Sequence, residues 1–365
     1  MKPLALAVLF FVACTDAQTD AQTRRAKPSS TPVVVAQGLQ VPWAIAFAPD
    51  GRMFVTERPG RVRVIEKGAL RPQPLLTITN VVAQGEAGLM GLALHPDFAR
   101  NHFVYVCYAL RPGSGQAGNM NDVVMRYRDT GEALVEPHPI VQNIPAARFH
   151  AGCRVKFGPD RKLYITTGDA TDGKIAQDLK SLGGKILRVN DDGSVPAENP
   201  FSGSPVWSFG HRNPQGIDWD PKSGLLFETE HGPSGFDGGY GGDEVNIVEK
   251  GLNYGWPVIH HNQKQEGMRT PLLEYTPPCA PASAAIWRGD LYFGCLRGTR
   301  LQRVRLDPND RRKVLGQDEL FPDLGRIREV IAGPDGALYF STSNRDGRGD
   351  PASNDDRIFK WSGDK

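Results

Sequence analysis

The chain has 365 residues, two to three times the length of a typical domain, so it either divides or forms one large repeat-built unit. Its 41 glycines and 29 prolines favour many turns, while 39% hydrophobic and 23% charged residues exclude a disordered chain and a coiled coil. The formal net charge of +2 gives no reason to expect nucleic acid or an anionic membrane surface as a partner.

The first residues have the pattern of an export signal. Lys2 precedes an apolar run over residues 4–13, which is too short to cross a bilayer, and no other stretch predicts a transmembrane span. Two interpretations stay open: a signal peptide over residues 1–17, or a lipoprotein signal that ends before Cys14 and leaves a lipid anchor there. Residues 18–33 then predict a flexible leader. Both interpretations place the protein in the bacterial periplasm, either soluble or lipid-anchored.

Four cysteines follow the signal region: Cys107, Cys153, Cys279 and Cys295. Export permits disulfides, and four cysteines allow three pairings. Their spacing matches no metal-binding motif. We expect a bridge between Cys279 and Cys295, with buried free thiols as the alternative.

A short pattern recurs along the chain and consists of an apolar strand, a turn with Pro-Asp-Gly or a relative, and a second strand. Proline sets the backbone for such a turn and glycine accepts a positive φ. The copies span residues 44–56, 91–106, 154–167, 216–229, 284–293 and 330–342. None of these units can bury both of its faces alone. They therefore predict radial packing around an axis.

We thus expect an all-β fold, a six-bladed β-propeller over residues 34–363. Residues 33–35 are expected to pair with residues 357–361 and so close the ring. The longer gaps between copies predict loops over one mouth of the propeller, where a site should lie. These gaps are residues 107–150, 169–210, 231–285 and 343–356.

Two groups of polar residues precede strands. His150 has the acid-base chemistry of a general base, although a lone loop histidine is usually structural. The segment 208–216 holds His211, Arg212, Asn213 and Gln215, which would suit a planar ligand with carbonyl or carboxylate groups. The alternative for this segment is a turn whose polar groups bind its own backbone.

Two further clusters suit ions. The oxygen-rich loop that begins at His231 would fit calcium, with a solvated turn as the alternative. Arg297, Arg326 and Arg328 would form a cradle for anions, with a solvated strand face as the alternative. The sequence contains no Gly-rich phosphate loop, Gly-x-Ser-x-Gly, His-Glu-x-x-His or Cys-x-x-Cys motif, which argues against nucleotide-dependent, serine-hydrolase and structural-zinc functions.

Four longer motifs are more specific and lie at residues 85–98, 210–216, 243–257 and 325–330. On these motifs the chain resembles the soluble, pyrroloquinoline quinone (PQQ)-dependent aldose sugar and glucose dehydrogenases. The resemblance covers nearly all of residues 34–363. It implies a periplasmic propeller that binds PQQ and calcium, oxidises aldoses at C1 to the lactone and passes electrons to an external quinone or redox protein. The enzyme would be a monomer or a homodimer.

The resemblance also implies roles for individual residues. His150 would remove the proton of the anomeric hydroxyl while hydride passes to the quinone, and Arg212 would polarise the quinone carbonyl. The expected PQQ contacts are Glu86, Arg212, Asn213, Arg297, Arg326 and Arg328. The carbonyl oxygens of Gly232 and Pro233 would bind one calcium ion, and Glu244 and Tyr254 would bind a second.

Three positions depart from the family pattern. Glu86 stands where relatives carry Gln, and its charge would repel a tricarboxylate unless it were protonated or paired with an arginine. Phe149 replaces an Asp of the glucose enzymes, and Arg297 replaces their Lys. The alternative function is a non-redox propeller that binds carbohydrate or protein, or a calcium-dependent hydrolase.

Overall fold

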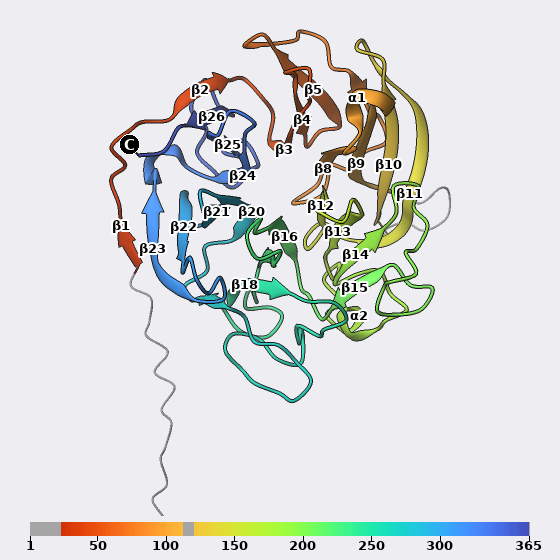
Figure 1. The fold of residues 1–365 in the computed structure, drawn as a ribbon, viewed down its shortest axis with the longest axis vertical. Helices are drawn as coiled ribbons and strands as arrows, with labels where there is room; N and C mark the ends of the chain where they lie inside the picture. Colours follow the sequence, from red (N-terminus) through yellow and green to blue (C-terminus); the bar gives the residue numbers. More distant parts are fainter. Residues whose placement is uncertain (1–22, 112–119, 365) are drawn as a thin grey trace, which may run out of the picture.

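The computed structural model describes residues 23–111 and 120–364, and its strands form six sheets around a central axis (Figure 1). The predicted six-bladed β-propeller is confirmed. Each of the six sequence repeats forms the first two strands of one blade.

The first three blades follow the chain from residue 42. Blade 1 comprises β3 (Pro42–Phe47), β4 (Met53–Glu57), β5 (Arg61–Glu66), β6 (Ala69–Leu70) and β7 (Leu76–Thr77). Blade 2 comprises β8 (Leu89–Leu94), helix α1 (Phe98–Asn101), β9 (Phe103–Leu110), β10 (Met120–Asp129) and β11 (Leu134–Ala146). Blade 3 comprises β12 (Gly152–Phe157), β13 (Leu163–Thr167), helix α2 (Lys174–Gln177), β14 (Lys185–Val189) and β15 (Val206–Phe209).

The other three blades complete the ring and include the two earliest strands. Blade 4 comprises β16 (Pro214–Trp219), β17 (Leu226–Glu230), β18 (Asp243–Val248) and β19 (Leu273–Tyr275). Blade 5 comprises β20 (Pro281–Trp287), β21 (Asp290–Cys295), β22 (Arg300–Leu306), β23 (Val314–Leu320) and β1 (Thr23–Arg25). Blade 6 comprises the 3₁₀ helix η1 (Pro322–Leu324), β24 (Ile327–Ala332), β25 (Leu338–Thr342), β26 (Ile358–Trp361) and β2 (Val33–Ala36).

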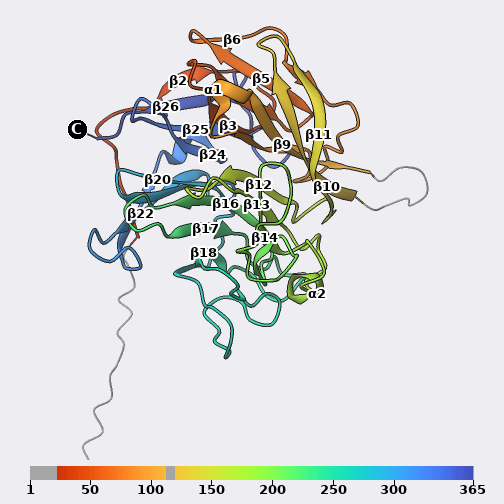
Figure 2. The same cartoon turned by 45° about the vertical axis from the view of Figure 1, so that its right-hand side comes forward.

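The first strands of the blades contact one another in a closed circle of β3, β8, β12, β16, β20 and β24. This close approach requires a small residue at places along the circle. A Cβ atom on Gly91 of β8 would collide with the carbonyl of Cys153 on β12. The outer strands do not make this close approach, and two long ones, β10 and β11, lie at the outer side of blade 2 (Figure 2).

The gap 107–150 was expected to be a loop, but its described residues lie largely in β9, β10 and β11.

The ring closes as expected, because β2 pairs with β26 in antiparallel register with Val33 opposite Lys360. Part of the expected leader also lies on the propeller. Strand β1 pairs in parallel with β23, and the Nε of Arg24 donates to Asp318 at 2.6 Å. The signal-peptide and Cys14 predictions fall outside the described residues. Within the described residues, no helix has the length and apolarity needed to cross a membrane.

The expected bridge between Cys279 and Cys295 is wrong. The disulfide joins Cys107 on β9 to Cys153 on β12, with Cα atoms 5.8 Å apart, while Cys279 and Cys295 are buried free thiols. Sequence spacing did not indicate this pair, because β9 and β12 become neighbours only when blades 2 and 3 pack together.

Replacing both Cys107 and Cys153 by serine should lower the free energy of unfolding by about 2–5 kcal/mol, because the bridge restricts the unfolded chain. Denaturant melts of the double variant and the wild type measure this difference. Cys279→Ser is the matched control, since it changes a buried cysteine without removing a bridge. A double variant no less stable than this control would contradict the prediction.

Candidate active site

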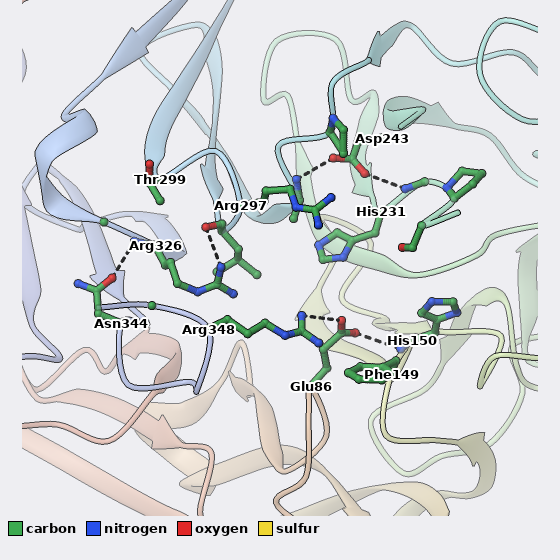
Figure 3. A pocket seen from close by; sticks show the side chains of 18 of the residues that line it. Glu86, Phe149, His150, His231, Asp243, Arg297, Thr299, Arg326, Asn344 and Arg348 are labelled. Atoms are coloured by element: carbon green, nitrogen blue, oxygen red, sulfur yellow. Dashed lines mark hydrogen bonds and ion pairs between the residues drawn. The ribbon is translucent and has the colours of Figure 1, made fainter. Parts of the chain in front are cut away.

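The connections of five blades converge on a cavity of about 640 Å³ at one mouth of the propeller (Figure 3). Six of the sequence-predicted residues line it: Glu86, His150, Gly232, Pro233, Arg297 and Arg326. Arg212, Glu244 and Tyr254 line a smaller adjoining cavity, which shares Gly232 and Pro233 with the first. Asn213 and Arg328 are buried next to residues of these cavities. The structure thus brings the predicted site residues together.

His150 is held in a defined orientation by a carboxylate that the sequence analysis did not identify. Its Nδ1 lies 2.6 Å from Oδ1 of Asp169, whose Oδ2 accepts from Nε1 of Trp256 at 2.8 Å. An ionised Asp169 places the ring proton on Nδ1 and leaves the Nε2 lone pair free. Among the described residues, Nε2 has no hydrogen-bond partner.

The backbone around this pair is constrained. His150 has a φ of 57°, an uncommon conformation for a residue other than glycine that is often found at functional sites. A Cβ atom on Gly168 would collide with the His150 carbonyl, so only glycine lets the loop after β13 approach closely enough to bring Asp169 to the imidazole.

Glu86 makes polar contacts on both of its oxygens. Its Oε2 accepts from the His150 amide and from Nδ2 of Asn213, both at 3.0 Å, and its Oε1 lies 3.6 Å from Nη1 of Arg348. Figure 3 shows Glu86 between Arg348 and the His150 backbone. Burial alone would raise the pKa of this carboxyl, but the charges of His231, His150 and Arg348 outweigh it and hold the pKa below its usual value. Glu86 is therefore paired with an arginine.

Arg212 is buried with its guanidinium fixed on several sides. Asp237 accepts from its Nε at 2.7 Å and from its Nη2 at 2.6 Å, and the His231 carbonyl accepts from Nη1 at 2.9 Å. The indole of Trp256 lies beneath it, 5.4 Å from the guanidinium carbon to the ring centre. Its amide donates to Oε1 of Glu230.

Two arginines of blade 6 share one carboxylate. Asp346 Oδ2 accepts from Nε and Nη2 of Arg326 at 2.9 and 2.7 Å, and it lies 3.6 Å from Nη2 of Arg328. Burial, reinforced by the charges of Arg326 and Arg58 and opposed by Asp346, lowers the pKa of Arg328 to about 10. The cluster therefore carries more positive than negative charge. Arg297 lies at the cavity edge and is exposed.

Three carboxylates gather beneath the cavity on β17 and β18. Glu230 lies opposite Glu244 in the sheet register, and ligand atoms of His211, Glu228 and Glu230 all lie within 4.8 Å of one another. Burial, followed by the charge of Glu230, raises the pKa values of Glu228 and Glu244 well above the usual range. Within the described residues, the buried Oε1 of Glu228 has no hydrogen-bond partner.

The hydrogen bonds around the expected ligands differ between the two predicted calcium sites. Asp243 accepts from the amides of Gly232 and Ala280 at 2.9 and 2.7 Å and so fixes the loop that carries the Gly232 carbonyl. Tyr254 has its hydroxyl hydrogen-bonded to the Ile247 carbonyl at 2.7 Å. Its main-chain oxygen is therefore the group that it can offer to a cation.

The sequence analysis missed four residues of the site: Asp169, Phe236, Asp346 and Arg348. It counted Asp237 among the oxygens of the loop expected to bind calcium, whereas the structure pairs Asp237 with Arg212. Asp169 follows β13, but the register of the β12–β13 hairpin did not point to it. Phe157 pairs with Leu163 next to the turn, and a bulge between Gly152 and Val155 then shifts the register so that Gly152 pairs with Thr167. The other missed residues lie on connections between strands, where no periodicity fixes side-chain direction.

Comparison with known proteins gives a family for this geometry. The family model described as glucose / sorbosone dehydrogenase matches residues 39–349. The chain belongs to this family. The predicted membership is thus confirmed, and with it the prediction of an oxidoreductase.

Three relatives illustrate how far the similarity extends within the glucose/sorbosone dehydrogenase family. The aldose sugar dehydrogenase of Escherichia coli K12 is 32% identical over 353 residues, which cover 88% of this chain and 92% of the relative. Quinoprotein glucose dehydrogenase B of Acinetobacter calcoaceticus is 31% identical over 62% of this chain and 52% of its own length. The solved PQQ-bound aldose sugar dehydrogenase of Streptomyces coelicolor is 37% identical, with a TM-score of 0.79 and coverage of 91% of this chain and 98% of that one.

Proposed function

We propose that this family member oxidises aldose sugars at C1 to the lactone, with PQQ and calcium as cofactors, and passes the electrons to an external quinone or redox protein. The observation that carries the proposal is the His150–Asp169 pair, whose free Nε2 lies beside a cavity lined by arginines. A module that only binds carbohydrate or protein has no need of an oriented base next to a cluster of cations.

The chain's own residues supply the acid-base chemistry. His150 Nε2 accepts the proton of the anomeric hydroxyl, and Asp169 stabilises the imidazolium that results. The buried guanidinium of Arg212 would donate to the quinone oxygen on which negative charge develops. PQQ, when bound, supplies the two-electron acceptor for the hydride that leaves C1.

The residues present fit a tricarboxylate cofactor. Arg326 and Arg328 share one carboxylate, so their cluster keeps positive charge available for an added anion. Arg297 adds a cation at the cavity edge, and Asn213 and Glu86 complete the expected contacts. The charge of Glu86 is offset by Arg348.

Calcium fits two places. Gly232, Pro233 and Asp243 line one edge of the main cavity, where the carbonyls of Gly232 and Pro233 would bind the ion. The Pro233 carbonyl also accepts from the Gly241 amide at 3.2 Å. Glu244, together with Glu228, Glu230 and the main-chain oxygen of Tyr254, would hold a second ion. A divalent cation there would relieve the repulsion between the buried carboxylates. The unpartnered Oε1 of Glu228 would then be a ligand of that cation.

The proposal includes export to the periplasm. The Cys107–Cys153 disulfide supports it, because such bridges form and persist in oxidising compartments. Cleavage after residue 17 or lipidation at Cys14 would then give a soluble or an anchored enzyme, as a monomer or a homodimer.

Reconstitution tests the function directly. PQQ should quench the intrinsic fluorescence of the calcium-loaded protein with a Kd at or below the micromolar range, and the loaded protein should reduce an artificial dye with glucose, galactose or maltose. Stripping calcium with a chelator should weaken PQQ binding at least tenfold, and adding calcium back should restore it. No PQQ binding at micromolar protein would favour a non-redox propeller instead.

A further inference from the structure

Residues 234–242, between β17 and β18, form a glycine-rich strap with the sequence Ser-Gly-Phe-Asp-Gly-Gly-Tyr-Gly-Gly. The strap is attached to two cations of the site. Asp237 binds the guanidinium of Arg212 at 2.6–2.7 Å, and the hydroxyl of Tyr240 accepts from Nη1 of Arg297 at 3.2 Å. Both arginines belong to the candidate site, so these contacts place the strap beside the cavity.

Phe236 directly precedes Asp237 on this strap. Its ring is nearly parallel to the imidazole of His150, at an angle of 19° with ring centres 6.1 Å apart. The residue lines the main cavity and is 68% exposed. Within the described residues it belongs to none of the hydrophobic core clusters, so packing stability does not explain a phenylalanine at this position.

The rest of the cavity offers little apolar surface beside the base. Phe149 is the other aromatic residue of the lining, but guanidinium groups cover its ring, with Arg148 at 5.3 Å and Arg348 at 5.0 Å from the ring centre. Aldoses are amphipathic, with hydroxyls around the edge of the ring and C–H groups on its faces. Phe236 provides the uncovered apolar surface that such a face needs next to His150.

We propose that Phe236 is a sugar-recognition residue, whose ring packs against a C–H face of the aldose while the anomeric hydroxyl meets Nε2 of His150. This inference rests on the proposed function and extends it to the substrate. The contact forms in both the ground state and the transition state, so Phe236 contributes to sugar affinity more than to the chemical step.

The test replaces Phe236 by alanine in the PQQ- and calcium-loaded enzyme. The KM for glucose should rise about tenfold through loss of buried apolar area, while kcat stays within about twofold. Phe236→Trp should restore KM, because it keeps an aromatic face. Leu315→Ala is the matched control, since Leu315 is also exposed, at 52%, but lies on β23 away from the site.

Two binding measurements separate this inference from the proposed function. Calorimetric titration of glucose into enzyme whose PQQ has been chemically reduced measures sugar binding without turnover, and Phe236→Ala should weaken it by the same factor. The PQQ Kd of the variant should match that of the wild type.

If PQQ binds and sugar is oxidised but the glucose affinity of the variant is unchanged, the inference is wrong. A rise confined to the KM of the electron acceptor would also overturn it. Failure of PQQ to bind the wild type would instead refute the proposed function.

Discussion

Replacing His150 by alanine should lower kcat for aldose oxidation about 10²- to 10⁴-fold, the usual contribution of a positioned general base. The structure supports this because Nε2 is the ring atom left free once Asp169 holds Nδ1 at 2.6 Å. Dye reduction at saturating PQQ and sugar measures the effect. Added imidazole should restore part of the rate, since it can occupy the space left by the side chain.

Two further measurements make this prediction specific. Asp169→Asn should lower kcat while leaving the PQQ Kd unchanged, because the Asp169 side chain orients the base. The residue meets Arg212 only through its main-chain amide, which donates to the Arg212 carbonyl at 2.8 Å and is retained in the variant. Thermal melting of both variants checks that the fold persists, which matters because His150 and Asp169 are buried. Wild-type turnover in His150→Ala would show that another group removes the proton.

The fold was predictable because its signal repeats. Each inner strand pair carries the same apolar alternation and turn, so weak evidence at one copy, such as residues 284–293, is strengthened by the others. Ring closure followed from the same logic, because an open sheet edge has to be paired. The outer strands had no such support. β10 and β11 lie in a gap between repeats, and the sequence analysis took that region for a loop.

The candidate residues that the structure brings together could be named from the sequence where they lie at strand ends within dense motifs, as at Gly210–Asn213 and Arg326–Arg328. The partners of those residues could not be named in this way. Asp237 and Asp346 bind Arg212 and Arg326 from loops that a neighbouring strand does not hold in register. The disulfide was missed for a related reason, since it connects two blades and its spacing reflects packing rather than local chain direction.

Glu86 is a case in which the sequence analysis posed a physical problem that the structure answers. A carboxylate in the place of a neutral amide must be protonated or paired, and the sequence left both options open. Arg348 supplies the pairing at 3.6 Å, and its guanidinium also lies over the ring of Phe149. Two of the three departures from the family pattern, Glu86 and Phe149, therefore contact the same arginine.

Replacing Arg328 by methionine should weaken PQQ binding about 30-fold or more. Truncating one member of a buried charge pair costs roughly 2–5 kcal/mol in binding, and each 1.4 kcal/mol is a factor of ten. Arg328 is buried beside Asp346, so the variant would leave that carboxylate paired with Arg326 alone. The negative charge of Asp346 would then repel the carboxylates of PQQ. Fluorescence titration with PQQ measures the loss.

The position of each arginine predicts a graded series. Arg297→Met should weaken PQQ binding only a fewfold, because an exposed cation is screened by water and salt. Arg328→Met combined with Asp346→Asn should recover part of the affinity of the single variant, since the unbalanced carboxylate is neutralised. Melting curves establish that each variant is folded before its Kd is interpreted. If Arg328→Met bound PQQ within threefold of the wild type, the blade 6 arginines would not form the anion cradle, and the cofactor carboxylates would have to be held elsewhere in the cavity.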